Sequence, residues 1–154
     1  MKLTSGSVTL ALEPLDGGYG LSVYYAGESA PAFVSATPVS LYTKKCTSSP
    51  LVYGGLYTTV ASCEDGLQAE GTLTTQAGSL FRFQDRYVPG AAGGFSLYRK
   101  VTVEQAGVRE RGFATRVALQ LPSPDTLSDV NCFAPGVWYQ KNEFVPPHFM
   151  GYHK

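Results

Sequence analysis

The residues best suited to chemistry lie close together near the end of the chain. Residues 133–139 contain proline and glycine and end in Trp138 and Tyr139, and Asn142 and Glu143 follow shortly after. Aromatic rings stack on the C–H faces of sugars, while planar amide and carboxylate groups bond their hydroxyls. The turn-forming residues favour a loop, where binding sites concentrate. We therefore expect Trp138, Tyr139, Asn142 and Glu143 to contact carbohydrate; the competing interpretation is that both rings seal one end of the core.

Carboxylates are the next candidates, because hydrolysis of a glycosidic bond needs two of them roughly 5–9.5 Å apart. The candidates are Asp85, Asp125, Asp129 and Glu143. Asp85 alternates with Phe81 and Phe83, so its side chain can face inward and pair with an arginine. The arginines nearby are Arg82, Arg86 and Arg99. Inward-facing pairs are more often structural, and we predict no catalytic residue in this chain.

Cysteine, histidine and glycine spacings do not indicate a metal, cofactor or phosphate site. Cys46, Cys63 and Cys132 are an odd set without CxxC spacing, so we expect buried free thiols, with a Cys46–Cys63 bridge as the alternative. His148 and His153 lie outside the HExxH spacing. The glycine pairs lack a phosphate-binding context and a following helix. We therefore predict no cofactor and no metal.

Charge and hydropathy argue against two classes of partner. Twelve basic residues balance twelve acidic ones, whereas nucleic-acid binding normally requires a basic excess. No apolar run approaches the roughly 20 residues of a membrane helix. Residues 1–7 carry one charge and no apolar segment, unlike a signal peptide. We expect a soluble chain without nucleic-acid or membrane partners, cytosolic as it stands or supplied without its signal.

Apolar and polar residues alternate along most of the chain, which predicts strands. The expected strands are 7–13, 19–25, 38–45, 52–62, 67–75, 80–88, 95–104 and 112–121, with a short apolar piece at 32–35. Gly54 and Gly55 indicate a bulge or a break inside 52–62. The two cleanest runs, 95–104 and 112–121, are expected to pair with each other as an antiparallel ribbon.

Length and composition favour one all-β domain. A chain of 154 residues suits a single domain, and its 16% charged residues fall below the roughly 25% of an average domain. Short strands separated by turns are typical of a sandwich or barrel. We predict an antiparallel β-sandwich over residues 1–124. Residues 125–154 are expected to be irregular and aromatic, and either to pack on the sandwich or to lead to a domain absent from this chain.

Three stretches of the second half carry a resemblance to a known family. They are GFSLYRKVTV (94–103), GFATR (112–116) and DVNCFAPGVWY (129–139). Together they resemble the N-terminal β-sandwich, or supersandwich, domain of bacterial six-hairpin glycoside hydrolases of the α-L-rhamnosidase-like kind. The resemblance covers roughly residues 80–145. In that family the sandwich precedes an (α/α)6 toroid, which carries the catalytic acid and base.

The resemblance implies a non-catalytic domain of a carbohydrate-active hydrolase. Such a domain supports an (α/α)6 catalytic module and contributes a loop to the cleft that binds the glycan. Here that loop would contain Trp138, Tyr139, Asn142 and Glu143. No activity is expected from these residues alone, because they include no toroid. Two alternatives remain open. One is an autonomous carbohydrate-binding module for an oligo- or polysaccharide, and the other is a structural or assembly β-domain that buries an apolar patch against a partner chain.

Overall fold

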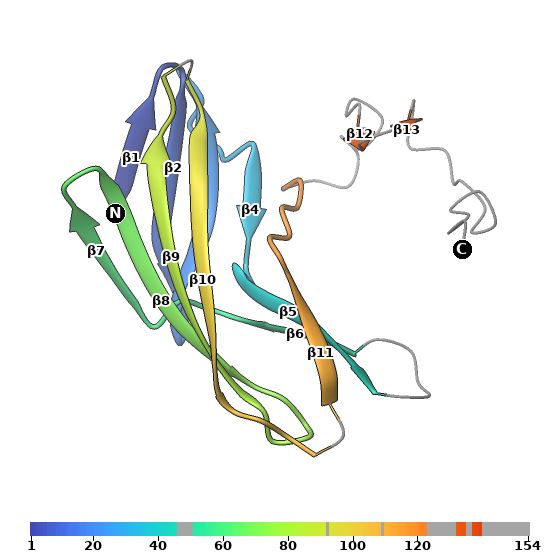
Figure 1. The fold of residues 1–154 in the computed structure, drawn as a ribbon. Helices are drawn as coiled ribbons and strands as arrows, with labels where there is room; N and C mark the ends of the chain where they lie inside the picture. The colour runs from blue at the N-terminus through green and yellow to red at the C-terminus, as the bar shows by residue number, and fades with distance from the viewer. Residues whose placement is uncertain (46–50, 92, 109, 123–131, 135–136, 140–154) are drawn as a thin grey trace. The chain divides into compact units, whose positions relative to one another are not determined.

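The computed structural model describes residues 1–45, 51–91, 93–108, 110–122, 132–134 and 137–139. None of these residues is helical, and their strands pair antiparallel. The chain divides into two compact units, Met1–Gln120 and Leu121–Lys154. The predicted all-β, sandwich-like fold is confirmed, and the first unit contains three of its sheets (Figure 1).

The chain begins with a four-stranded sheet, here called sheet A, in the order β1-β2-β3-β4. Its strands are β1 (Lys2–Ser5), β2 (Val8–Leu15), β3 (Gly18–Tyr25) and β4 (Phe33–Ser35). Leu15 pairs with Gly18 across Asp16 and Gly17, and Gly17 has a φ of 87°. An Asp-Gly pair suits this tight turn because glycine accepts positive φ without a steric penalty. The predicted hairpin is confirmed, whereas the sequence pattern did not predict β1.

A second four-stranded sheet, sheet C, has the order β10-β9-β8-β7. Its strands are β7 (Thr59–Cys63), β8 (Gly66–Thr74), β9 (Leu80–Pro89) and β10 (Phe95–Gln105). Alternate residues of β8 and β9 are buried, so one face of the sheet is apolar. Of the predicted bulge or break at Gly54 and Gly55, the structure has the break, because one strand ends at Gly55 and the next begins at Thr59.

The third sheet, sheet B, has the order β11-β5-β6. Its strands are β5 (Val39–Lys45), β6 (Leu51–Gly55) and β11 (Glu110–Arg116). The prediction that 95–104 and 112–121 pair with each other is therefore wrong: β10 pairs with β9, and β11 pairs with β5. The strand expected over 112–121 is also shorter, since Gln120 makes only an isolated bridge to Val34.

The connection between β10 and β11 passes from one layer to the other. Packed sheets lie about 10 Å apart, whereas paired strands lie about 4.8 Å apart, so these two strands meet through side chains across the core. Phe113 on β11 packs edge-to-face on Phe81 of sheet C, with 4.9 Å between ring centroids. The Arg99 side chain of β10 likewise reaches Thr115 and Arg116 of β11, so side chains and not ladder hydrogen bonds connect the two strands.

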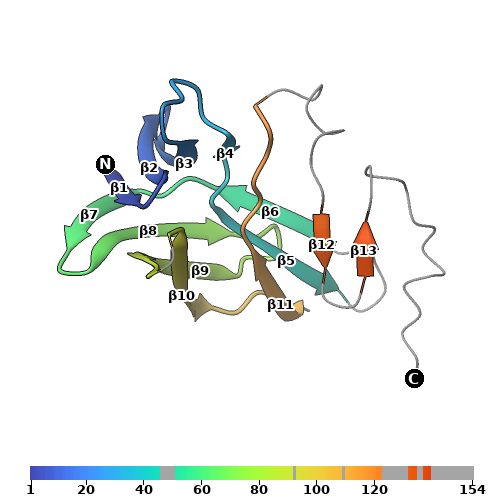
Figure 2. The same ribbon diagram turned by 90° about the horizontal axis from the view of Figure 1, so that it is seen from above.

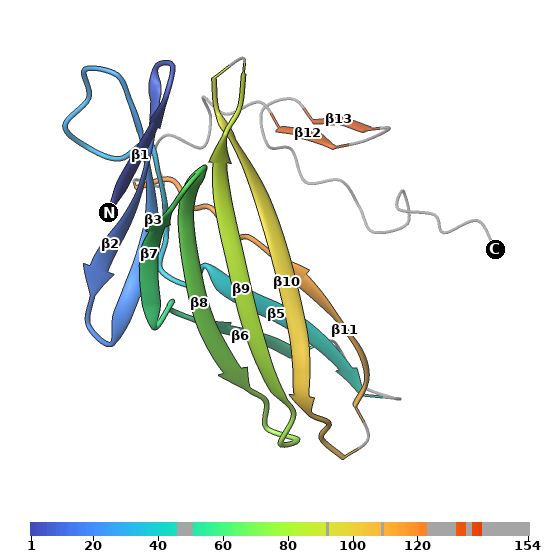
Figure 3. The same ribbon diagram turned by 60° about the vertical axis from the view of Figure 1, so that its left-hand side comes forward.

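Sheets B and C face each other, and sheet A lies alongside them (Figures 2 and 3). All three contribute to one hydrophobic core, together with Tyr57, which lies between β6 and β7. The buried core residues are Leu10, Leu12, Leu21, Val39, Leu41, Tyr57, Leu67, Ala69, Leu73, Phe81, Phe83 and Tyr87. Burial of their side chains at about 1.5–3 kcal/mol for each large one is the main stabilising contribution.

The second unit contains one described ribbon, formed by β12 (Cys132–Ala134) and β13 (Val137–Tyr139). Phe133 pairs with Trp138, and Cys132 pairs with Tyr139. Trp138 and Tyr139 therefore lie on a strand rather than in the expected loop. Aromatic and β-branched residues on either side of a Pro-Gly pair favour extended backbone, which explains the difference.

Candidate functional site

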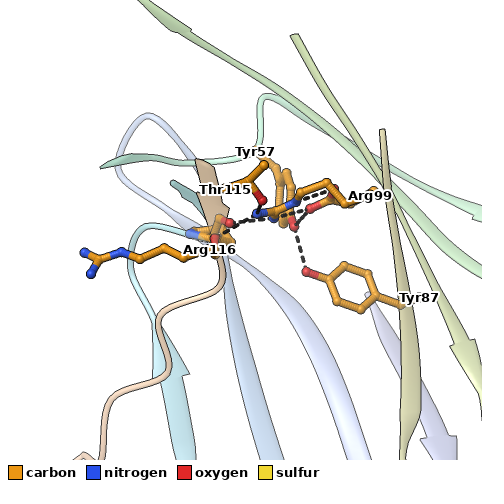
Figure 4. Close-up of polar contacts among 7 residues, drawn as sticks. Tyr57, Tyr87, Arg99, Thr115 and Arg116 are labelled. Carbon is orange, nitrogen blue, oxygen red and sulfur yellow. Dashed lines mark hydrogen bonds and ion pairs between the residues drawn. The ribbon is translucent and has the colours of Figure 1, made fainter. Parts of the chain in front are cut away.

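Four residues of the first unit are joined by hydrogen bonds between their side chains, and we call them the polar cluster: Tyr57, Asp85, Tyr87 and Arg99 (Figure 4). The alternation of β9 points Asp85 and Tyr87 inward, into the row that also holds the buried phenylalanines. Arg99 on β10 is the register partner of Asp85. Side chains paired in this way lie on the same face of a sheet, so the sheet itself brings the two charges together.

The carboxylate of Asp85 is held on both oxygens. The Arg99 guanidinium donates from Nε to Oδ1 at 2.8 Å and from Nη2 to Oδ2 at 2.5 Å, which is a two-pronged ion pair. The Tyr57 hydroxyl donates a further, short hydrogen bond to Oδ2. Asp85 is 1% exposed and the Arg99 side chain 9%. The pair is therefore shielded from solvent and compensated internally.

The same guanidinium also reaches sheet B. It donates to the backbone oxygen of Arg116 at 2.8 Å, to that of Pro38 at 2.8 Å, and to the Thr115 hydroxyl at 3.4 Å (Figure 4). Arg99 thus connects sheet C with β11 and with the residue that precedes β5. Removing it would release contacts in two sheets at once.

Tyr57 connects the polar cluster to sheet A. Its backbone exchanges hydrogen bonds with that of Tyr19 on β3 at 2.9 and 3.1 Å, and its hydroxyl lies 2.6 Å from that of Tyr87. All three sheets therefore meet at the polar cluster. Buried polar groups that are fully hydrogen-bonded can fix one arrangement of packed elements, which is the role the geometry gives this cluster.

The ionisation of the polar cluster follows from its burial. Burial raises the pKa of Tyr87 to about 12 and that of Tyr57 well above its ordinary range. Burial opposes the charge on Arg99, but the hydrogen bonds and the charge of Asp85 outweigh it and raise the pKa of Arg99. The tyrosines keep their protons at neutral pH and Arg99 keeps its charge. A site of this kind stabilises structure and has no accessible group for proton transfer.

The prediction that Asp85 faces inward and pairs with an arginine is confirmed, and Arg99 is the partner. The other two arginines point outward: Arg82 pairs with Glu104 at 2.5 Å, and Arg86 with Asp65 at 3.4 Å. The sequence did not identify Tyr57 as part of this site. Its only signal was its place just after the Gly-Gly break, where the chain leaves one sheet for another.

The predicted carbohydrate contacts belong to the second unit. Trp138 and Tyr139 lie on β13, and their side chains are outside the description. Asn142 and Glu143 lie outside the described residues, as do Asp125, Asp129, His148 and His153. The contact therefore remains a prediction. Of the cysteines, Cys63 is a half-buried free thiol, Cys132 is on β12, and Cys46 lies outside the described residues.

Within the described ranges, no three His, Cys, Asp or Glu side chains gather as metal ligands. No helix in that part of the chain is long and apolar enough to cross a membrane. Comparison of the chain with protein-family models, curated proteins and solved structures finds no match. The functional inference therefore depends on the residues and their geometry.

Proposed function

We propose that this chain is a non-catalytic β-sandwich domain of a bacterial glycoside hydrolase. It supports an (α/α)6 catalytic module and contacts glycan through Trp138, Tyr139, Asn142 and Glu143. The motif resemblance described above, from residue 94 to residue 139, is the starting point. The sandwich-like core of three antiparallel sheets is compatible with such a supporting domain.

The state of Asp85 is the observation that carries the proposal. A glycosidase needs a pair of carboxylates at roughly 5–9.5 Å that substrate can reach. Asp85 is the buried carboxylate that sequence reasoning selected, and it is 1% exposed and bound on both oxygens. Arg99 and Tyr57 already bond both carboxylate oxygens, so Asp85 is not free to act as a catalytic acid or base. This favours a supporting role for the domain over a catalytic one.

Apolar side chains on the surface support the docking of a partner module. Between residues 103 and 119 several large ones remain exposed, including Val108 at 75% and Phe113 at 41%. The others in this stretch are Val103, Val117 and Leu119. They follow one another along the chain, and exposed apolar side chains are typical of interaction surfaces where they form one patch. A catalytic module that covers β11 and the residues before and after it would bury them.

The test is a glycosidase assay on the purified chain with aryl glycosides and oligosaccharides. We expect no turnover above the buffer control. Turnover that disappears in Asp129→Asn or Glu143→Gln would overturn the proposal, because the chain would then supply its own acid or base. A full-length parent protein that lacks an (α/α)6 module would overturn it independently.

A further inference from the structure

A shallow pocket of about 270 Å³ lies on sheet A, and none of its lining residues belongs to the polar cluster. Its walls come from β2, β3, β4 and the residue after β4: Glu13, Leu15, Gly20, Ser22, Val34 and Ala36, together with the buried residues Leu21 and Ser35. Glu13 pairs with Gly20, and Ser22 pairs with Val34. These side chains point away from Leu12 and Leu21, which belong to the core. The pocket is therefore on the outer face of the sheet.

Glycine at position 20 lets the Leu15 side chain lie directly over the backbone of β3. A Cβ atom there would lie 2.6 Å from Leu15 Cδ1 and 3.1 Å from the backbone oxygen of Ser35. Either approach is closer than ordinary packing allows, so a larger residue would displace Leu15 and fill the space. The position of Leu15 at the pocket wall therefore depends on this glycine.

Glu13 presents an ionised and oriented carboxylate at the wall. The Tyr24 hydroxyl donates to Oε1 at 2.8 Å and to Oε2 at 3.0 Å. The Ser22 hydroxyl, and after it that of Tyr24, lowers the pKa of Glu13 against the opposing effect of burial. None of the described ion pairs includes Glu13, so its oxygens keep capacity for further donors.

The charge around Glu13 favours an uncharged ligand. The Lys2 ammonium lies 5.3 Å from the centre of the Tyr24 ring and lowers the pKa of Glu13 by its charge. The N-terminal amine acts in the same direction, so two positive groups reduce the attraction of this carboxylate for an added cation. The ligand that fits is neutral, donates hydrogen bonds to a carboxylate, and has an apolar face for Leu15 and Val34.

We propose that this pocket binds one pyranose unit of a neutral glycan. Two neighbouring sugar hydroxyls donate to the Glu13 carboxylate, and a C–H face of the ring lies on Leu15 and Val34. The volume is just below the roughly 300–1,000 Å³ of common ligand sites, which suits a single ring. This inference rests on the proposed function, because it places a glycan contact of the same domain on a second set of residues.

The experiment is a titration of the isotopically labelled full chain with methyl glucoside, mannoside, galactoside and rhamnoside, followed by NMR. We expect millimolar binding of at least one, with the largest shifts at the amides of Glu13 and Leu15 and of residues 20–22 and 34–36. Glu13→Gln should weaken binding about tenfold or more, since hydrogen bonds to charged groups contribute about 1.5–3 kcal/mol. Leu15→Ala should weaken it through the lost apolar wall.

Glu28→Gln is the matched control, because Glu28 is an exposed glutamate on the turn that follows β3. It should leave the affinity unchanged, and an unperturbed spectrum of Glu13→Gln shows that the variant is folded. Flat titrations with all four sugars would overturn the pocket assignment, as would glycoside binding that Trp138→Ala abolishes and Glu13→Gln does not. The assignment would also be overturned if the chain binds methylammonium, loses that binding in Glu13→Gln, and binds none of the four sugars. Glycoside turnover by the chain would instead overturn the proposed function.

Discussion

Replacing Arg99 by methionine should be among the most destabilising single changes in the first unit. The change keeps the apolar stem and removes the guanidinium, with its two bonds to Asp85 and its bonds to the Arg116 and Pro38 oxygens. Asp85 would keep only the hydroxyl of Tyr57 as a donor while its side chain remains 0% exposed. The variant therefore buries a carboxylate that lacks its counter-charge.

The size of the effect follows from that burial. Removing one partner of a buried ion pair costs about 3–5 kcal/mol. For a unit of this length 1 kcal/mol corresponds to about 4 °C in Tm, so the melting temperature should fall by about 12–20 °C. The free energy of unfolding of a domain is about 5–15 kcal/mol, so we expect enough stability to remain for the variant to fold at low temperature.

Urea unfolding followed by far-UV circular dichroism is the appropriate assay. Circular dichroism follows the strands of the first unit directly, whereas the one tryptophan, Trp138, belongs to the second unit. Arg82→Met is the control, because Arg82 forms a surface pair with Glu104 and their side chains are 49% and 28% exposed. That change should cost less than about 1 kcal/mol.

The double variant Arg99→Met with Asp85→Leu separates the charge from the packing. With both charges gone, no unpaired charge is buried and Tyr57 keeps its hydrogen bond with Tyr87, so part of the lost stability should return. If Arg99→Met costs no more than Arg82→Met, the polar cluster does not hold the sheets together. If the double variant is no more stable than the single one, the uncompensated charge is not the cause of the loss.

Three further results are expected, each measured by urea unfolding. Gly66→Ala should cost about 1–3 kcal/mol because its Cβ would overlap the backbone oxygen of Tyr87, whereas Gly112→Ala, with open space around it, should be near neutral; equal costs would contradict this. Thr43→Val should be neutral or stabilising, since no described group bonds the buried Thr43 hydroxyl, and a loss above about 1 kcal/mol would show a hidden partner. Stability should fall as the pH rises above about 10, by up to about 1.4 kcal/mol per pH unit for each of Tyr57 and Tyr87. The reason is that both have raised pKa values in the folded chain and keep protons that the unfolded chain releases. A flat profile there would exclude their burial.

The parts of the fold that the sequence predicted are those set by near neighbours. Alternation within β2 and β3, with Asp16 and Gly17 between them, specifies a hairpin without help from the rest of the chain. The inward direction of Asp85 was predictable for the same reason, since it shares a row with Phe83. Period-two patterns determine which face a side chain occupies.

The parts that were not predictable depend on distant residues. Alternation in β10 and β11 was recognised, but the same pattern fits strands that pair and strands that face each other across a core. The choice depends on contacts such as Phe113 with Phe81, which no local signal specifies. Tyr57 and the pocket beside Glu13 also depend on which strands meet, and no spacing along the chain indicates either.

The pairing of Leu41 with Thr115 has a consequence for how the protein is made. On the ribosome, β5 and β6 emerge long before β11, so one edge of that hairpin stays open until most of the first unit has been translated. Asp85 likewise lacks its ion-pair partner until Arg99 has been translated, and Arg99 lacks one of its acceptors until Arg116 has been translated. The first unit therefore completes its core late in synthesis, and a nascent chain that stalls before Arg116 exposes a strand edge on which aggregation can begin.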